Sequence, residues 1–273
     1  MIPRQVAIVS QTSNIDIREL CIVSAALERQ ATRDFGPIWG IAPTVDPFVD
    51  LSDVPAGYWP IVIRDDIKAP GAAGFHEDTQ GHPFSLVQYS STWSLTCSHE
   101  CLEMLADPFG SRLVPGDAPE AAGGARVEYL LEVCDPCEDV GFAYTVNKVL
   151  VSDFYTPRFF DPTTGPVRYD FTGSIHTPRT VLNNGYISWY NPADDHWHQL
   201  TCFGGVERLK DLGKLSRRDG SPRAQIDAAT TVEQLVDGAD ADPGVASRRA
   251  ETQNALTDRA KRLQREIDDI AGA

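Results

Sequence analysis

The spacing of hydrophobic positions changes along the chain, and a helical period is clearest between residues 91 and 110, STWSLTCSHECLEMLADPFG. When successive residues are placed about 100° apart, the apolar side chains of this segment fall on one broad arc and the polar side chains on the opposite one. The apolar arc holds Leu95, Cys97, Cys101, Leu102, Met104 and Leu105, and the polar arc holds Thr96, His99, Glu100, Glu103 and Asp107. The pattern predicts an amphipathic helix with a His-Glu-x-x-Glu motif on its polar face.

The residues before this motif helix are expected to form strands around one further helix. Apolar runs predict four strands, at residues 5–10, 38–45, 58–66 and 84–89. Residues 16–35 have apolar positions at helical spacing, and Gly36-Pro37 is expected to end that helix. The segment 68–83 is rich in glycine and proline and is expected to be a loop. This order of elements predicts an α+β fold.

The residues after the motif helix change in character. Residues 125–139 fit a short helix and a strand equally well, so their type stays open. Residues 142–203 are aromatic and rich in β-forming residues, and turn signals such as Asn184-Gly185 predict hairpins. A charged connector is expected from residue 204 to 223. Two helices are expected beyond it, near residues 224–237 and 245–270.

These elements predict one main domain with a tail. Residues 1–140 are expected to form an α/β core with the motif helix, residues 141–205 a β-rich subdomain packed on it, and residues 206–273 a charged connector with C-terminal helices. A chain of 273 residues with 42% hydrophobic content can bury a substantial core. The last predicted helix has an apolar stripe among many charges, which favours self-association or docking on a partner.

Composition excludes some classes of partner. The formal net charge of −15 argues against nucleic-acid binding, which a basic patch usually supports. No apolar run approaches the roughly 18 to 20 residues that a membrane-spanning helix needs. The N-terminal residues show no sustained apolar region with a cleavage site. We therefore expect a cytoplasmic protein that binds neither nucleic acid nor a membrane.

The six cysteines allow more than one interpretation; they are Cys21, Cys97, Cys101, Cys134, Cys137 and Cys202. In a chain of this length with no signal peptide, reduced thiols are favoured over disulfides. Cys97 and Cys101 with Cys134 and Cys137 have spacings that also allow a structural four-cysteine zinc site. However, the first pair lies on the apolar arc of the motif helix, where a thiol commonly behaves as a small buried hydrophobe. The second pair leaves a redox pair or a disulfide open.

The polar arc of the motif helix carries the clearest chemistry. His99 and Glu103 stand one helical turn apart, the i, i+4 relation that lets two side chains of one helix bind a single metal ion. Glu100 lies beside them as a candidate general base. A catalytic zinc ion typically takes three protein ligands and keeps one position for water. The motif therefore predicts a metal site that needs a third ligand from elsewhere.

The order of strands and helices up to this motif resembles the N-terminal half of zincin metallopeptidases. The resemblance implies a twisted mixed sheet over the active-site helix, with the last strand, here residues 84–89, at the edge of a substrate cleft where an extended peptide pairs with it. It also implies a downstream carboxylate as the third ligand, for which Glu132 and Asp135 are the candidates. The usual zincin motif has histidine where this chain has Glu103. A second carboxylate shifts the preference from zinc toward harder ions such as calcium or manganese.

A second resemblance covers residues 96–138. HECLEMLADP followed by EVCDPC is similar to the HExxE, DP and ExxDxC pattern of phosphate-induced, exordium-like proteins. That likeness implies a polar cluster of His99, Glu103, Glu132 and Asp135, with Glu100 as its acid/base member.

Together these observations predict a zinc-dependent peptidase that acts on a peptide or protein substrate through a metal-bound water. The alternative is a non-catalytic binding or assembly protein that keeps a zincin-like scaffold and uses the carboxylates structurally. Tyr155 and Tyr186 are candidate oxyanion stabilisers if the β-rich residues close over the metal. His76 and His82 are expected in the loop before the edge strand, where histidines are more often merely exposed.

Overall fold

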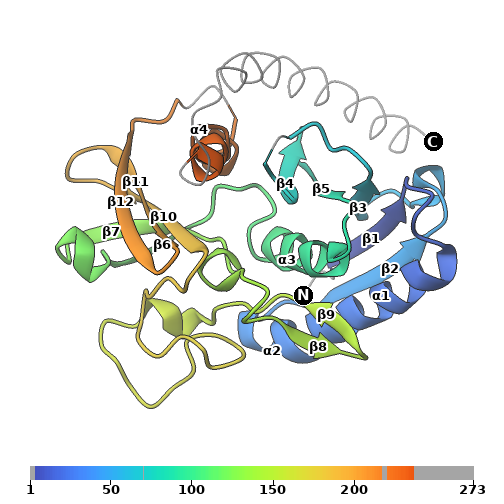
Figure 1. Cartoon of the computed structure of the whole chain (residues 1–273), viewed down its shortest axis with the longest axis horizontal. Helices are drawn as coiled ribbons and strands as arrows, with labels where there is room; N and C mark the ends of the chain where they lie inside the picture. Colours follow the sequence, from blue (N-terminus) through green and yellow to red (C-terminus); the bar gives the residue numbers. More distant parts are fainter. Residues whose placement is uncertain (1–3, 70, 217–219, 237–273) are drawn as a thin grey trace.

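The chain forms an α+β structure in which two five-stranded sheets lie on either side of the motif helix (Figure 1). A computed structural model describes residues 4–69, 71–216 and 220–236. The predicted α+β class is confirmed at this level. The α-helices are α1 (Ile17–Arg29), α2 (Gly36–Trp39), α3 (Trp93–Ala106) and α4 (Pro222–Val236).

The first sheet has the strand order β2-β1-β3-β5-β4. Its strands are β1 (Arg4–Ser10), β2 (Pro43–Phe48), β3 (Trp59–Arg64), β4 (Gly74–Thr79) and β5 (His82–Gln88). All neighbours pair in parallel except β4, which runs antiparallel to β5. Val6 and Ile8 of β1 belong to the large core that α1 and α3 share, while Ala7 and Val9 belong to a smaller cluster. Burial on both faces explains the continuous apolar run of β1.

The edge of this sheet differs from the expectation. Residues 84–89 were expected to form the edge strand, but β5 lies between β3 and β4, and β4 is the edge. The predicted loop at 68–83 therefore contains a strand. Gln80 and Gly81 both have positive φ, 50° and 82°, and join β4 to β5 in a two-residue turn of the kind that favours tight hairpins. The polar sequence of β4, GFHEDT, hides the strand because only one side of an edge strand needs to be apolar.

The first helix continues beyond its predicted end. Asp16 caps α1 by accepting a hydrogen bond from the backbone N–H of Glu19. A π-helical segment, Gln30–Phe35, then leads into α2. Pro37 does not stop the chain because it lies in the first turn of α2, where its missing N–H is tolerated. Gly40, with φ of 68°, ends the helix, and β2 follows at Pro43 instead of residue 38.

The motif helix α3 has the two faces that its sequence predicts. Leu102, Met104 and Leu105 are fully buried in the large core, and so are Cys97 and Cys101. The six cysteines are free thiols, and Cys21 is the exposed one. This agrees with the expectation of reduced thiols and places the Cys97/Cys101 pair in the core.

The second sheet is antiparallel and has the order β12-β11-β10-β7-β6. Its strands are β6 (Leu113–Asp117), β7 (Arg126–Leu130), β10 (Gly185–Asn191), β11 (His196–Phe203) and β12 (Val206–Gly213). Residues 125–139, whose type was open, form β7 and then a 3-10 turn, Asp135–Cys137. Residue 140 was the expected boundary between the core and the β-rich subdomain. The second sheet contains β6 and β7 from before this residue and β10, β11 and β12 from after it. β12 lies in the expected connector, so that expectation was wrong.

The remaining elements connect the two sheets. β8 (Tyr144–Val146) and β9 (Val149–Val151) form a short hairpin, and the latter contacts α3. Residues 167–171, within the segment where hairpins were expected, form only an isolated β-bridge, between Tyr155 and Asp170. α4 confirms the helix predicted near 224–237, and the one predicted at 245–270 lies outside the described residues. Within the described chain, no helix is long and apolar enough to cross a membrane.

Candidate metal centre

The polar face of α3 meets the turn after β7. His99 Nε2 lies 3.3 Å from Glu103 Oε2 and 3.2 Å from Asp135 Oδ1. Nitrogen and oxygen ligands about 2.0 to 2.2 Å from a tetrahedral zinc ion are roughly 3.3 to 3.5 Å apart. Both separations are close to that spacing. Asp135 Oδ1 is also buried without an aligned hydrogen bond, which suits an atom that faces a cation.

Glu132 belongs to the same cluster but faces another partner. Oxygen atoms of Glu103, Glu132 and Asp135 lie within 4.8 Å of one another. One oxygen of Glu132 accepts a hydrogen bond from Arg223, and the other, Oε1, is buried without a partner. Both carboxylates expected downstream of the motif are therefore near Glu103, and Asp135 is the one beside His99.

Glu103 belongs to three of the four candidate ligand groups found among the described residues. Its Oε1 accepts a hydrogen bond from the backbone N–H of Cys134 at 3.1 Å, and its Oε2 accepts one from Arg223 Nη1 at 2.7 Å. Burial alone would raise the pKa of Glu103, but the charges of His99 and Arg223 lower it well below its usual value. In turn, burial would lower the pKa of His99, and the charge of Glu103 with the Asp135 contact raises it well above its usual value. The lowered pKa favours the ionised form of Glu103, although its side chain is fully buried.

Asp135 itself has a very different protonation equilibrium. Burial raises its pKa to about 7, and the charge of Glu103 acts in the same direction. Glu138, three residues further on, has its pKa raised to about 8 by burial and by Asp135. A bound cation would favour the ionised forms of these carboxyls. The donor set of one imidazole and several carboxylates therefore fits zinc and harder divalent ions alike.

His76 is a member of the cluster that the sequence did not predict. It lies on β4 with 1% of its surface exposed, not in a loop. Its Nε2 is 2.9 Å from the carbonyl oxygen of Asp107, while Nδ1 lies 3.6 Å from Glu100 Oε2 and 3.8 Å from Glu103 Oε2. Phe75 and His76 are neighbours in β4 and both are buried, so the strand lacks the alternation of buried and exposed residues that would predict it. The sequence therefore gave no sign that His76 is buried. His82, at the start of β5, is exposed.

Glu100 lies where β4 crosses α3. A Cβ added to Gly74 of β4 would meet Glu100 Oε1 at 2.9 Å and Thr96 Cγ2 at 2.8 Å. Glycine at position 74 is therefore what allows this close approach. Glu100 Oε2 is buried without a hydrogen-bond partner. The candidate base is thus held against the edge strand.

Arg223 of α4 is the second member that sequence reasoning missed. It is 4% exposed and donates hydrogen bonds from Nη1 to both Glu103 and Glu132. Its Nε lies 3.3 Å from Asp227 Oδ2, one helical turn away. Nothing local marks Arg223 among the other charged residues of the C-terminal part, because its partners are 120 and 91 positions away.

The other candidates divide. Tyr155 is fully buried, its hydroxyl has no hydrogen-bond partner, and burial with the charge of Glu132 raises its pKa well above its usual value. Burial, with the charge of Asp135, also raises the pKa of Tyr186. Among the described residues, each candidate ligand group includes at most one cysteine, Cys134, so a four-cysteine site is not formed there.

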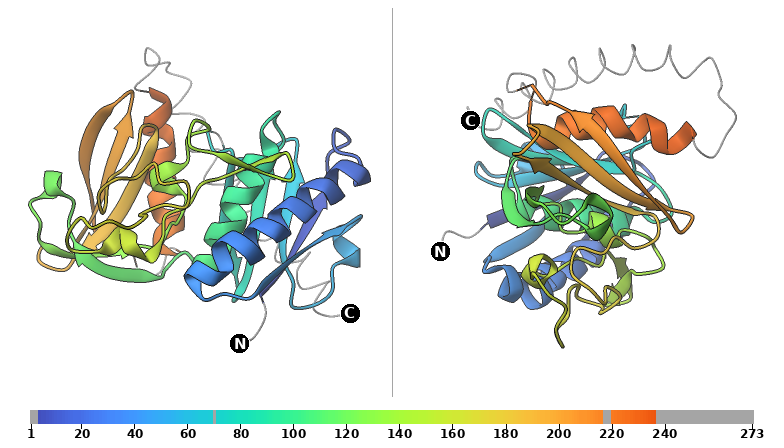
Figure 2. Two further views of the ribbon diagram at one scale, coloured as in Figure 1. Left: turned by 90° about the horizontal axis from the view of Figure 1, so that it is seen from below. Right: turned by 90° about the vertical axis from the view of Figure 1, so that its left-hand side faces the viewer.

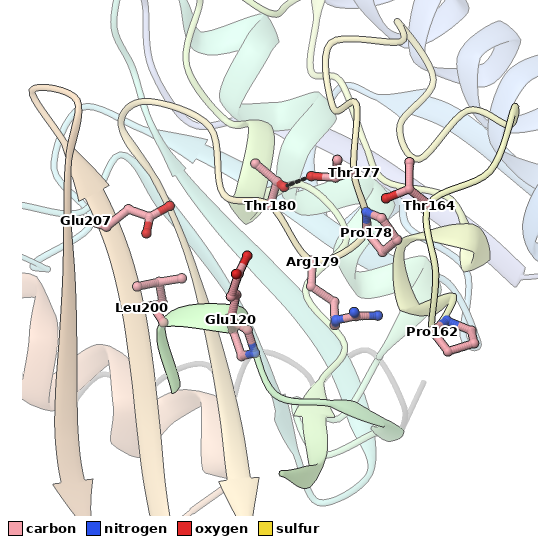
Figure 3. Close-up of a pocket in the computed structure, with 11 residues that line it drawn as sticks. Glu120, Pro162, Thr164, Thr177, Pro178, Arg179, Thr180, Leu200 and Glu207 are labelled. Carbon is pink, nitrogen blue, oxygen red and sulfur yellow. Dashed lines mark hydrogen bonds between the residues drawn. The ribbon is translucent and has the colours of Figure 1, made fainter. Parts of the chain in front are cut away.

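A separate cavity of about 320 Å³ lies between the second sheet and the segment after β9 (Figure 3). It is lined by prolines, threonines, Arg179, Glu120 and Glu207. The cavity contains no member of the His99 cluster, so the candidate chemistry is elsewhere.

Comparisons with known proteins give no relative. No family model matches the chain, and neither the curated proteins nor the solved structures searched contain a match.

Proposed function

We propose that this protein is a metal-dependent peptidase with a single-ion, zincin-like centre. The observation that carries the proposal is the position of His99 Nε2, 3.3 Å from Glu103 Oε2 and 3.2 Å from Asp135 Oδ1. The arrangement of a mixed sheet with one antiparallel edge strand beside α3 supports the same proposal. His99, Glu103 and Asp135 would hold the ion, and Glu132 would lie beside it.

A zinc ion bound there would polarise a peptide carbonyl and lower the pKa of a water molecule toward about 7. Glu100 would accept the proton of the attacking water as the oxygen of that water bonds to the carbonyl carbon. The same carboxyl group would pass the proton to the amide nitrogen as the C–N bond breaks. The products are a carboxylic acid and an amine, and Glu100 returns to its ionised form.

β4 is the strand that would align the substrate. It is the end strand of the first sheet, and its Gly74 lies directly against Glu100. An extended peptide added to this edge would form main-chain hydrogen bonds next to the cluster. In this proposal β4 takes the part that the sequence suggested for residues 84–89.

The alternative is a non-catalytic protein that uses the carboxylate cluster to hold its parts together. Its support is the pair of hydrogen bonds from Arg223 to Glu103 and Glu132, which already joins α4, α3 and the residue after β7. In a protein of this kind Glu103 and Glu132 would stay paired with Arg223, and Glu100 would have no catalytic role.

Zinc titration followed by peptide hydrolysis separates the two. We expect the wild type to bind zinc and His99→Ala to lose more than about 100-fold in zinc affinity. Loss of a residue that binds the ion should weaken zinc affinity more than loss of a residue that only hydrogen-bonds to a ligand, which costs about 10 to 100-fold. Glu100→Gln should keep zinc and lose about 10² to 10⁴-fold of the hydrolysis of fluorescent casein. His198→Ala, a histidine paired with Asp194 at 3.1 Å on the second sheet, is the matched control. Absence of zinc from the wild type, with His99→Ala equally stable, would refute the metal site.

A further inference from the structure

The proposed catalytic groups are almost completely buried. Glu100, Glu103 and Asp135 are 3%, 0% and 2% exposed. The side chain of His99 is 12% exposed. Glu100 is too deeply buried among the described residues for a peptide bond to lie beside it, so the proposed hydrolysis requires an element to move.

α4 lies between α3 and the second sheet (Figures 1 and 2), and its Arg223 contacts two carboxylates of the cluster. Its inward face carries Arg223, Ile226 and Thr230, which are 4%, 2% and 5% exposed. These positions are spaced i, i+3 and i+7, so they share one side of the helix. The outward residue Ala228 is exposed. One face of the helix is therefore buried: Arg223 on it contacts the cluster, and Ile226 packs against the second sheet.

Arg223 is the strongest link between α4 and the site. Its guanidinium donates to Glu103 and Glu132, which come from two different parts of the fold. The other contacts are modest. Ile226 packs with Leu130 and Trp197, and the backbone N–H of Arg223 donates to the carbonyl of Gly110 at 3.1 Å.

We propose that α4 is a built-in cover of the active site, held closed by Arg223, and that its release admits the peptide substrate. This inference rests on the proposed peptidase function. Arg223 closes the site by binding a carboxylate that the metal also needs. An ion at Glu103 Oε2 would share that oxygen with the guanidinium, and two cations so close repel each other. Metal binding therefore weakens the latch, and opening completes the path for the substrate.

The first test removes the latch. Arg223→Met keeps much of the side-chain length and deletes the charge. Backbone hydrogen exchange of residues 222–230 should rise by about tenfold or more, because the helix opens locally more often. With zinc bound, casein hydrolysis should rise by about tenfold or more over the wild type. Arg126→Met is the matched control, since Arg126 pairs with Asp117 at 3.0 Å on the exposed side of the second sheet. It should change neither measurement.

The second test locks the cover, and it does not depend on the folding of an arginine variant. A Cβ at Gly110 would lie 3.4 Å from Ser221 Cβ, just short of the roughly 3.5 to 4.5 Å usual for disulfides, and 2.9 Å from Arg223 Cβ, a close contact that the oxidised and reduced forms share. The variant is Gly110→Cys with Ser221→Cys, made together with Cys21→Ser because Cys21 is the exposed thiol. The φ of 56° at Gly110 strains both redox forms alike, so the comparison is between oxidised and reduced protein. The oxidised form should lose hydrolysis while dithiothreitol restores it.

The outcomes separate this inference from the function on which it rests. If the wild type binds no zinc, the peptidase proposal fails and the cover fails with it. If zinc binds and Glu100→Gln abolishes hydrolysis, but the oxidised lock is as active as the reduced form, the cover alone is wrong. Faster exchange in Arg223→Met with unchanged hydrolysis leads to the same conclusion. A lock that blocks hydrolysis reversibly, with a more active Arg223→Met, supports the cover.

Discussion

Exchange of Asp135 for asparagine tests the third ligand with almost no change in shape. Asp135 Oδ1 lies 3.2 Å from His99 Nε2, whereas the hydrogen bond of Glu132 is made to Arg223. An amide oxygen carries no net charge and is a much weaker zinc ligand than a carboxylate. We expect Asp135→Asn to lose about 100-fold or more in zinc affinity, which corresponds to about 2.8 kcal/mol. Glu132→Gln, as an outer partner, should lose about 10 to 100-fold.

Calorimetric zinc titrations at a fixed pH and salt concentration measure both variants. Thermal unfolding of the metal-free proteins checks that each variant folds. Asp135→Asn should not be destabilised, because burial already penalises the ionised carboxylate and raises its pKa to about 7. The assignment is refuted if Glu132→Gln loses more affinity than Asp135→Asn, or if Asp135→Asn binds zinc as the wild type does.

Three further predictions follow from burial and charge. Burial raises the pKa of Asp135 to about 7 and that of Asp153 to about 8, so the folded state holds these protons more tightly than the unfolded state does. The stability of the metal-free protein should therefore fall as the pH rises from about 5 to about 8, which thermal unfolding at several pH values measures; a rise over that window would contradict it. Zinc affinity should rise over the same window, because the ligand histidine must lose its proton, and titration at each pH checks this. Gly74→Ala should cost about 1 to 3 kcal/mol in denaturant unfolding and displace Glu100, while Gly165→Ala, with nothing within 4 Å of the added Cβ, should be nearly neutral.

The parts of the fold that were predictable are those with a local signal. β1 has a continuous run of apolar residues, and α3 has apolar residues on one side and polar residues on the other. Each pattern is typical of its type of element, so the sequence alone locates both. β4 was not predictable in the same way. Four of its six residues are polar, and an edge strand needs burial on one side only. The continuation of α1 past Gly36-Pro37 was missed because a proline in the first turn of a new helix is compatible with the helical backbone.

The candidate site shows the same division. His99, Glu100 and Glu103 lie on one helix, and spacing alone predicts that they share a face. Glu132 and Asp135 came from a resemblance, and the structure brings both close to Glu103. His76 and Arg223 arrive through tertiary contacts 24 to 120 positions away from their partners, between elements whose pairing no local pattern specifies.

Arg223 also gives a physical reason for the glutamate at position 103. The carboxylate of Glu103 accepts hydrogen bonds from the backbone of Cys134 and from the guanidinium of Arg223. An imidazole in its place has only one acceptor nitrogen, and in the protonated form it would repel the guanidinium. A histidine at 103 would restore the commoner motif but leave only Glu132 and Asp227 to balance the charge of Arg223. The departure from His-Glu-x-x-His fits the cover proposed for α4, because a carboxylate at position 103 receives the guanidinium of Arg223 and, in the proposed site, would also bind the ion.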